Sequence, residues 1–259
     1  MKDTLFFETV DSTNRVAREL ACEDRPHGFA ILAGSQTAGR GRLGKAWQSP
    51  SGKGLYCTIL VRPELAVKDY SKITLTAGLA VSLALKEICH LQSQLKWPND
   101  IYISGRKCGG ILVETSSLQD TDERNFGLVG IGVNINSEKG AFSSELQETA
   151  TSVFIETGKE HDIWSIFAGI RVRLLQLLLQ LEREGFAAIL SQWRERDMLQ
   201  GRWMKWVTPA GEVVYGKSLG VDSSGTLMVR DHAGMSHEVL SGDVTLASRL
   251  CEKTGKADI

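Results

Sequence analysis

The chain has 259 residues, of which 42% are hydrophobic and 24% are charged. This apolar content argues against intrinsic disorder, and the length suffices for one large domain or a main domain of about 200 residues with a small second one. Thirty basic and thirty-one acidic side chains leave a net charge of −1, which excludes a global positive field that gathers nucleic acid or anionic membranes.

The first half of the chain alternates short apolar runs with two helical patterns. The expected elements, in chain order, are a strand over residues 5–7, a helix over 13–22, strands over 29–33 and 55–61, a helix of about five turns from residue 71, and strands over 95–97, 101–103, 110–114 and 128–133. Asp11 or Ser12 is the expected N-cap of the first helix, and Ser71 that of the second. Gly28 and Gly34 are expected to bound the strand between them. This order predicts an α+β fold in which helices flank a mixed β-sheet.

The second half of the chain starts with a helix and ends in a β-rich segment. Residues 163–184 carry an apolar stripe that Gly185 ends, which predicts a packed helix, and the apolar run over 174–181 is too short to span a bilayer. Short β-type runs separated by glycine-bearing turns then cover residues 213–215, 226–229, 237–240 and 244–246. Their spacing predicts a small SH3-like barrel, so we expect domains over residues 1–200 and 201–259.

The ends of the chain and its cysteines indicate a cellular compartment. The five cysteines form no C-x-x-C pair, which disfavours a disulfide framework or a zinc site built from cysteines. The first eight residues lack the apolar run and the small-residue cleavage site of a secretion signal. We therefore expect a soluble cytoplasmic protein without membrane attachment.

The most informative segment is the loop over residues 34–47. Its three closely spaced glycines let backbone N–H groups approach an anion, and Arg40 and Arg42 supply forked donors that suit phosphate and carboxylate. Trp47 adds a flat face on which a purine could stack. No acidic residue lies over residues 25–63, so positive charge is concentrated here. A flexible, solvated basic loop would explain the same composition.

The loop also matches a nucleotide-binding fingerprint by spacing alone. Gly39, Gly41 and Gly44 have the G-x-G-x-x-G spacing, but that fingerprint needs a helix to begin within it and receive the pyrophosphate. Pro50 and the glycines that flank it prevent a helix of useful length. No G-K-[S/T] sequence completes a phosphate-binding P-loop either. The sequence therefore predicts neither a Rossmann fold nor a P-loop enzyme.

Three further segments carry polar groups at the ends of predicted elements. Asn99 and Asp100 follow a proline that confines their run to a strand end, and Lys107 follows a tight turn from which it could reach across a site. The glycines over residues 130–136 permit close approach of a ligand, and residues 11–14 carry hydroxyl and amide groups. Taken singly, each has an ordinary structural explanation: a turn former, a solvated lysine, a strand bulge and a helix cap.

Taken in this order, the segments resemble the biotin protein ligases, which adenylate biotin and transfer it to a carrier lysine. The matching segments are residues 11–14, 36–47, 96–100, 105–114 and 130–134. The ordered set is far more specific than any one motif. The resemblance implies a class II synthetase-like catalytic fold, with a mixed sheet flanked by helices, followed by an SH3-like C-terminal domain.

The resemblance also implies roles for individual residues. Contacts to biotin are implied for Ser12, Thr13, Asn14, Gln36, Arg40, Gly41, Arg42, Lys107, Gly110, Gly130 and Gly132. Contacts to ATP are implied for Gly39, Arg42, Trp47, Asn99 and Asn134. The expected catalytic residues are Arg40, Lys107 and Asp100, and Asp100 is also the candidate carboxylate for Mg²⁺ on ATP and a candidate base for the amine. The two cations would neutralise the biotin carboxylate and the α-phosphate.

The implied substrates are biotin and ATP with Mg²⁺, and the implied partner is a biotin carboxyl carrier protein, such as a subunit of acetyl-CoA carboxylase. A monomer or a homodimer fits equally. Ten residues precede Asp11, whereas a helix-turn-helix domain needs about 60, so we expect no operator binding.

Three alternatives stay open from the sequence. A lipoate ligase or octanoyl transferase uses the same scaffold, although its glycine-rich signature and linear acyl pocket are not found here. A nucleic-acid-binding module would explain the basic loop and the β-rich tail, but the net charge weighs against it. The third alternative is an interaction protein without catalytic activity. Such a protein would not need every charged position of the motifs, yet all of these positions are filled here.

Overall fold

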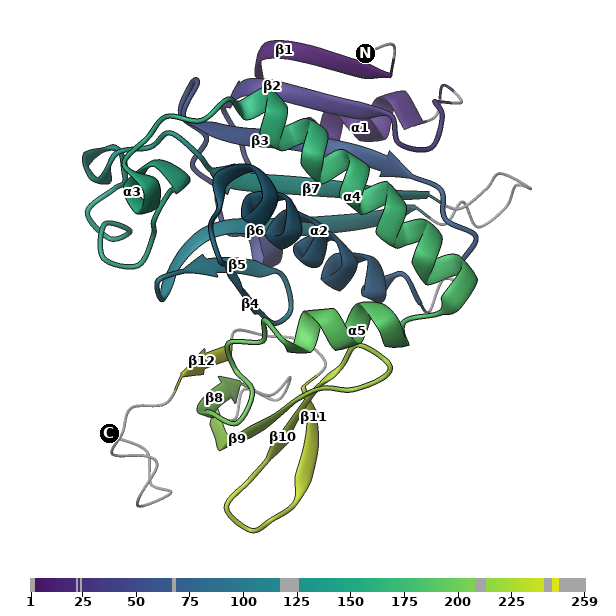
Figure 1. Ribbon diagram of the computed structural model, residues 1–259, viewed down its shortest axis with the longest axis vertical. Coiled ribbons are helices and arrows are strands. Elements are labelled where there is room, and N and C mark those ends of the chain that lie inside the picture. The colour runs from purple at the N-terminus through teal and green to yellow at the C-terminus, as the bar shows by residue number, and fades with distance from the viewer. Residues whose placement is uncertain are drawn as a thin grey trace.

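The computed structural model (Figure 1) describes residues 3–21, 23, 25–66, 69–116, 126–207, 213–239 and 244–246. These residues form a seven-stranded sheet with helices on both of its faces and a separate five-stranded sheet. The predicted α+β class, a mixed sheet flanked by helices, is therefore confirmed.

The larger sheet is mixed because its first two strands are joined by a helical crossover. Strand β1 (Thr4–Val10) runs parallel to β2 (Ala30–Gln36), with helix α1 (Thr13–Ala21) between them in sequence. All other neighbouring strands are antiparallel, in the order β1-β2-β3-β7-β6-β5-β4. The remaining strands are β3 (Gly54–Val61), β4 (Gln94–Lys96), β5 (Asp100–Ile103), β6 (Arg106–Ser116) and β7 (Phe126–Asn134).

Helices cover the two faces of this sheet unequally. Helices α2 (Ser71–Cys89) and α4 (Ile163–Glu184) pack against each other on one face, and α1 covers the other (Figure 1). The alternation of side chains along β2 shows this division, since Ala30 and Leu32 join the larger apolar cluster and Ile31 joins the smaller cluster with α1. Both faces of the central strands are thus buried.

Helix α4 is the one helix among the described residues whose length and composition would suffice to cross a membrane. Its stripe of Ile166, Phe167, Ile170 and Leu174 is fully buried in the apolar core, and Gly185 ends it with a positive φ of 80°. The sequence-based interpretation as a packed core helix is confirmed, because the apolar side chains already face protein.

The smaller sheet follows helix α5 (Ala187–Arg194) and is antiparallel throughout. Its strands are β8 (Trp203–Val207), β9 (Val213–Val221), β10 (Leu227–Arg230), β11 (Ser236–Val239) and β12 (Val244–Leu246), in the order β11-β10-β9-β8-β12. Apolar side chains of this sheet belong to the same buried cluster as α2, α4 and α5. The C-terminal segment is therefore docked on the larger sheet's helices.

Three details of the sequence-based prediction are wrong. Helix α2 begins at Ser71 itself, because Tyr70 already has helical backbone angles (φ −63°, ψ −23°) and occupies the cap position. Strand β2 runs through Gly34 instead of stopping there, since the missing side chain lets the strand lie close to the Glu8 carbonyl of β1. Helices α3 (Val153–Thr157) and α5 and strand β8 were not predicted, because their patterns are too short to rise above those of loops. Cys22 and residue 240, at the ends of two predicted elements, lie outside the described residues.

Candidate functional site

A cavity of about 340 Å³ lies on the face of the larger sheet that α1 partly covers. Strand alternation explains how the sheet makes room for it. Gly130 and Gly132 of β7 line the cavity, whereas Val129 and Val133, on either side of this glycine pair, belong to the apolar core on the opposite face. A side chain at either glycine would fill space already in use: at Gly130 it would collide with the Asn14 amide, and at Gly132 it would lie 2.6 Å from the Trp47 ring.

One wall of the cavity is a buried network of neutral polar groups. Gln36 Oε1 accepts from the Thr13 backbone N–H at 2.9 Å, and Gln36 Nε2 donates to Ser49 Oγ at 2.9 Å. The Thr58 hydroxyl lies 2.8 Å from Thr13 Oγ1 and donates to Asn14 Oδ1 at 2.6 Å. We call the side chains of Thr13, Asn14 and Gln36, which line the cavity, together with that of Thr58 behind them, the amide–hydroxyl wall. Its geometry is determined by its own hydrogen bonds, so it is preformed.

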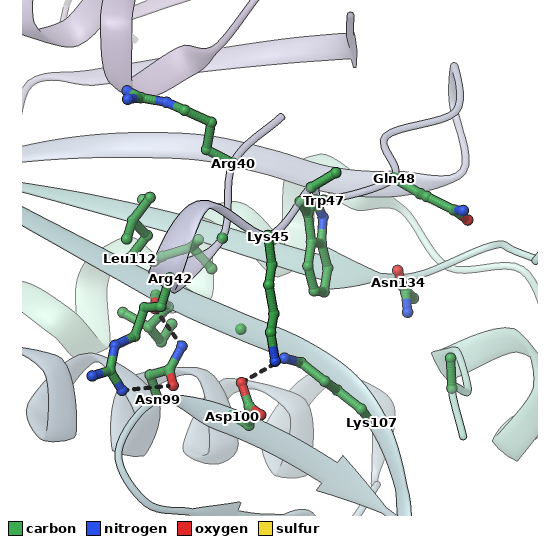
Figure 2. Close-up of a pocket in the computed structure, with 18 of the residues that line it drawn as sticks. Arg40, Arg42, Lys45, Trp47, Gln48, Asn99, Asp100, Lys107, Leu112 and Asn134 are labelled. Atoms are coloured by element: carbon green, nitrogen blue, oxygen red, sulfur yellow. Dashed lines mark hydrogen bonds and ion pairs between the residues drawn. The ribbon is translucent and has the colours of Figure 1, made fainter. Parts of the chain in front are cut away.

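The opposite wall is the glycine-rich loop, which folds back on itself as a flap. Gly41 N donates to the Lys45 carbonyl at 2.7 Å, and Trp47 N donates to the Gly39 carbonyl at 2.9 Å. Figure 2 shows Lys45 and Trp47 projecting from this flap into the cavity, with Arg40 turned away from them. No α-helix starts in the loop, which confirms that its G-x-G-x-x-G spacing is not a dinucleotide-binding fingerprint.

The third side of the cavity is the corner between β4 and β5 together with the start of β6. Asn99 Nδ2 donates to the Ile111 carbonyl at 2.9 Å, and Arg42 of the flap donates to Asn99 Oδ1 at 3.4 Å. Lys107 Nζ lies 2.6 Å from Asp100 Oδ1 and 5.7 Å from the centre of the Trp47 ring. Lys107 follows the predicted tight turn at Ser104–Gly105, where both residues have positive φ (50° and 76°). Figure 2 shows the ammonium groups of Lys45 and Lys107 converging near Asp100.

The cavity brings together almost all the residues that the sequence singled out. Its lining includes Ser12, Thr13, Asn14, Gln36, Arg40, Gly41, Arg42, Trp47, Asn99, Asp100, Lys107, Gly110, Gly130, Gly132 and Asn134. Gly39 does not line it. A Cβ atom at Gly39 would lie 2.5 Å from the Trp47 carbonyl oxygen. The glycine is therefore needed where the two strands of the flap backbone approach each other.

Sequence reasoning assigned no role in this site to Thr58, Lys45 or Glu114. Thr58 is fully buried within an apolar strand, and a buried hydroxyl needs a partner, which is the signal that could have found it. Lys45 was counted only as loop charge. Glu114 ends a matched segment, and its carboxylate accepts from Asn14 Nδ2 at 2.9 Å and lies 3.5 Å from Arg40 Nη2. Arg40 is thus paired with a carboxylate of the protein itself.

The cysteines near the cavity are structural. Cys57 and Cys108 are both buried, and burial raises the pKa of each thiol well above its usual range. Burial thus disfavours the thiolate form, and both cysteines pack as small apolar residues.

The described residues contain no group of three or more His, Cys, Asp or Glu side chains arranged to hold a metal ion. Asp100 is the one carboxylate among the described residues that line the cavity, and Lys107 already pairs with it. A magnesium ion fits here only in the manner typical of nucleotide enzymes, in which substrate phosphates supply most of the oxygens.

Comparisons with known proteins agree with this geometry. The model of the biotin/lipoate A/B protein ligase family matches residues 6–134. The bifunctional ligase/repressor BirA of Bacillus subtilis is 32% identical over 242 residues, which are 93% of this chain and 73% of that protein. A biotin–[acetyl-CoA-carboxylase] ligase of Paracoccus denitrificans is 34% identical over 227 residues, which are 86% of this chain and 92% of that protein. The biotin protein ligase of Aquifex aeolicus, solved in complex with biotin and ATP, superposes with a TM-score of 0.80 at 30% identity, covering 95% of this chain and 99% of that one.

Proposed function

Because the chain belongs to the biotin/lipoate A/B protein ligase family, we propose that its cavity binds biotin and ATP side by side. The activity is that of a biotin–protein ligase: ATP activates biotin as biotinyl-5′-adenylate, with release of pyrophosphate, and biotin then passes to a lysine of a carboxylase carrier protein. The observation that carries the site proposal is the meeting of a neutral, buried wall with several cationic side chains across one cavity.

Biotin is assigned to the amide–hydroxyl wall and the sheet floor. The biotin ring is neutral and polar, which suits the hydroxyl and amide groups of Thr13, Asn14 and Gln36, while Gly110, Gly130 and Gly132 leave room above the sheet. Ser12 borders the same wall. A neutral ring can exchange hydrogen bonds there without bringing a net charge into a buried region.

The biotin carboxylate is assigned to the region between the flap and Lys107. Two anions must meet for adenylation, so the reaction needs charge neutralisation and alignment more than a covalent nucleophile. Lys107, together with Arg40 and Arg42 and the backbone of Gly41, would neutralise the carboxylate and the oxygens of the α-phosphate as the bond to phosphorus forms. Lys45 converges on the same space and joins this set.

ATP is assigned to the flap and the β4–β5 corner. Trp47 offers a ring face for the adenine, and its buried Nε1–H has no hydrogen-bond partner among the described residues. Asn99 and Asn134 supply amide groups at the edge of the cavity, and Gly39 shapes the flap. Asp100 is the residue that would hold Mg²⁺ together with phosphate oxygens, and the ion would there assist the departure of pyrophosphate.

In the second step, the carrier lysine attacks the carbonyl carbon of the mixed anhydride and AMP leaves. The attacking amine must be neutral, so a base has to accept its proton. Asp100 is our candidate for that base, and its pairing with Lys107 keeps the carboxylate in the cavity. Closure of the flap would shield the anhydride from water between the steps.

The remaining features of the proposal concern the whole chain. We assign residues 1–200 to the catalytic domain and residues 201–259 to an SH3-like barrel, supported by the antiparallel order of the smaller sheet. We also propose a cytoplasmic enzyme, a monomer or homodimer, whose partners are a carrier protein, biotin and ATP. The net charge of −1 argues against nucleic acid or membranes as partners.

The direct test is to incubate the purified protein with ATP, Mg²⁺, biotin and a carboxylase carrier domain, and to weigh the carrier by mass spectrometry. We expect one added biotin per carrier, dependent on ATP. A parallel reaction with lipoate or octanoate in place of biotin tests the other activities of the same scaffold. Modification by these acids but not by biotin would overturn the proposal.

A further inference from the structure

The C-terminal sheet reaches the assigned nucleotide corner through one buried hydrogen bond. The Trp97 Nε1–H group donates to the Gly225 carbonyl at 3.0 Å, across 128 positions of sequence. Trp97 is only 5% exposed. It lines the main cavity and also a neighbouring cavity, which Gly225 and Thr226 border from the C-terminal side. This tryptophan therefore contacts the C-terminal sheet on one side and the site on the other.

The acceptor carbonyl belongs to a turn that its own hydrogen bonds hold in place. Between β9 and β10, Asp222 Oδ1 accepts from Ser224 N at 2.9 Å, from Ser224 Oγ at 2.7 Å and from Thr226 N at 2.9 Å. Gly225 has a φ of +89°, and a Cβ atom there would lie 3.3 Å from the Leu75 side chain of α2. The direction of the Gly225 carbonyl is thus set by Asp222 and by close packing.

The corner that Trp97 begins carries two of the assigned site residues. Asn99 is two residues and Asp100 three residues beyond Trp97. Their other anchors come from the larger sheet and the flap, namely the hydrogen bonds of Asn99 with Ile111 and Arg42 and the ion pair of Asp100 with Lys107. A shift of the indole would displace both residues, because the intervening backbone is a tight corner between two strands.

We propose that the turn over residues 222–226 is a positioning element for the nucleotide: through the bond to Trp97 it holds Asn99 and Asp100 where ATP needs them. Trp97 and Asp222 are positioning residues, since they act through Asn99 and Asp100. This inference rests on the proposed function, specifically on the assignment of ATP to this corner.

The first test is Trp97→Phe, which keeps a buried aromatic ring and removes the N–H donor. We expect the KM for ATP to rise about fivefold to tenfold, the size of one lost buried hydrogen bond. The KM for biotin should stay within about twofold, because the assigned biotin contacts of Thr13, Asn14 and Gln36 do not depend on this bond.

The second test acts from the other side of the bond. Asp222→Ala removes the acceptor that orders the turn, so we expect the KM for ATP to rise in the same direction. Asp222→Asn retains an Oδ1 acceptor, so its KM for ATP should be close to that of the wild type. Rescue by asparagine distinguishes an ordering role from any effect of charge.

The matched control is Asp231→Ala. Asp231 Oδ1 accepts from Met235 N at 2.9 Å in the turn between β10 and β11, so it orders a turn of the same sheet as Asp222 does, but outside both cavities. We expect this variant to lower the thermal midpoint and to leave the KM for ATP unchanged.

The outcomes separate this inference from its premise. Wild-type protein that forms no biotinyl-adenylate would overturn the proposed function and this inference with it. If the wild-type protein is active, an unchanged KM for ATP in Trp97→Phe, or an equal rise of that KM in Asp231→Ala, would overturn this inference alone.

Discussion

The two walls of the cavity differ in how much of their bonding is made within the protein. On the amide–hydroxyl wall, Thr13, Asn14 and Thr58 are at most 4% exposed and bond one another. On the flap, the Arg40 side chain is 49% exposed and pairs with the Glu114 carboxylate at 3.5 Å. One wall is rigid and neutral, and the other is exposed and cationic.

This difference matches what each half of the substrate pair requires. Neutral polar groups in a buried network select a ligand by shape and hydrogen bonding, because an unmatched group there is costly. Exposed cations interact weakly with anions in water, and their effect grows once a loop closes and excludes solvent. The first wall therefore serves recognition, and the second serves the charge that develops during adenylation.

The largest effect is expected from Lys107→Ala, at the point where the two walls meet the β4–β5 corner. The variant loses the ammonium that would stabilise charge in the transition state, so adenylate formation should fall about 100-fold to 1,000-fold. The Lys107 backbone forms hydrogen bonds with Thr149 and Thr151. Alanine preserves these bonds, so the fold should be intact. Pyrophosphate exchange measures the rate, and the thermal midpoint checks folding. An adenylation rate near that of the wild type would remove Lys107 from the catalytic set.

A smaller and different effect is expected from Arg40→Gly on the flap. The variant removes the forked donor and adds backbone freedom, so biotinyl-adenylate should dissociate about 10-fold to 100-fold faster. Arg40→Lys keeps the positive charge but loses the forked pair of donors. Its rate of adenylate dissociation should lie between those of the wild type and Arg40→Gly. The half-life of the enzyme-bound adenylate, measured by rapid filtration, is the deciding quantity. Equal half-lives for wild type and Arg40→Gly would show that the flap arginine does not hold the adenylate.

The sequence predicts the flap better than it predicts the buried wall. Charged and glycine-rich positions such as Arg40 and Gly41 stand out locally, since their residue types have few structural reasons to cluster. Thr58 lies in a strand of otherwise apolar residues, and its partners Thr13 and Asn14 are more than 40 positions away. Long-range bonds of this kind depend on the register of the strands, which no local pattern contains.

The same limit explains which parts of the fold were anticipated. The long apolar stripe of α4 predicts a buried helix by itself, because many residues repeat one period. Helix α5 has eight residues, and β8 has five, too few for a period to emerge. The bond from Trp97 to Gly225 is invisible for a related reason, since it joins two segments that only the docking of the smaller sheet brings together.

The smallest effect, and the sharpest test of the contrast between the walls, is expected from Thr58→Val. Valine has the same shape but leaves Asn14 Oδ1 without its buried donor, at a cost of about 1–3 kcal/mol. Part of that cost should appear as a lower free energy of unfolding. The rest should lower the affinity for biotin about tenfold, because the amide–hydroxyl wall is loosened. The KM for ATP should change much less than the affinity for biotin, since Thr58 is linked to Arg40 of the flap through Asn14 and Glu114 and not directly. Thr58→Ser retains the hydroxyl and is the matched control, with calorimetric titration of biotin as the measurement. If Thr58→Val instead altered ATP and biotin equally, the two walls would be one coupled unit, and the division of labour between them would be wrong.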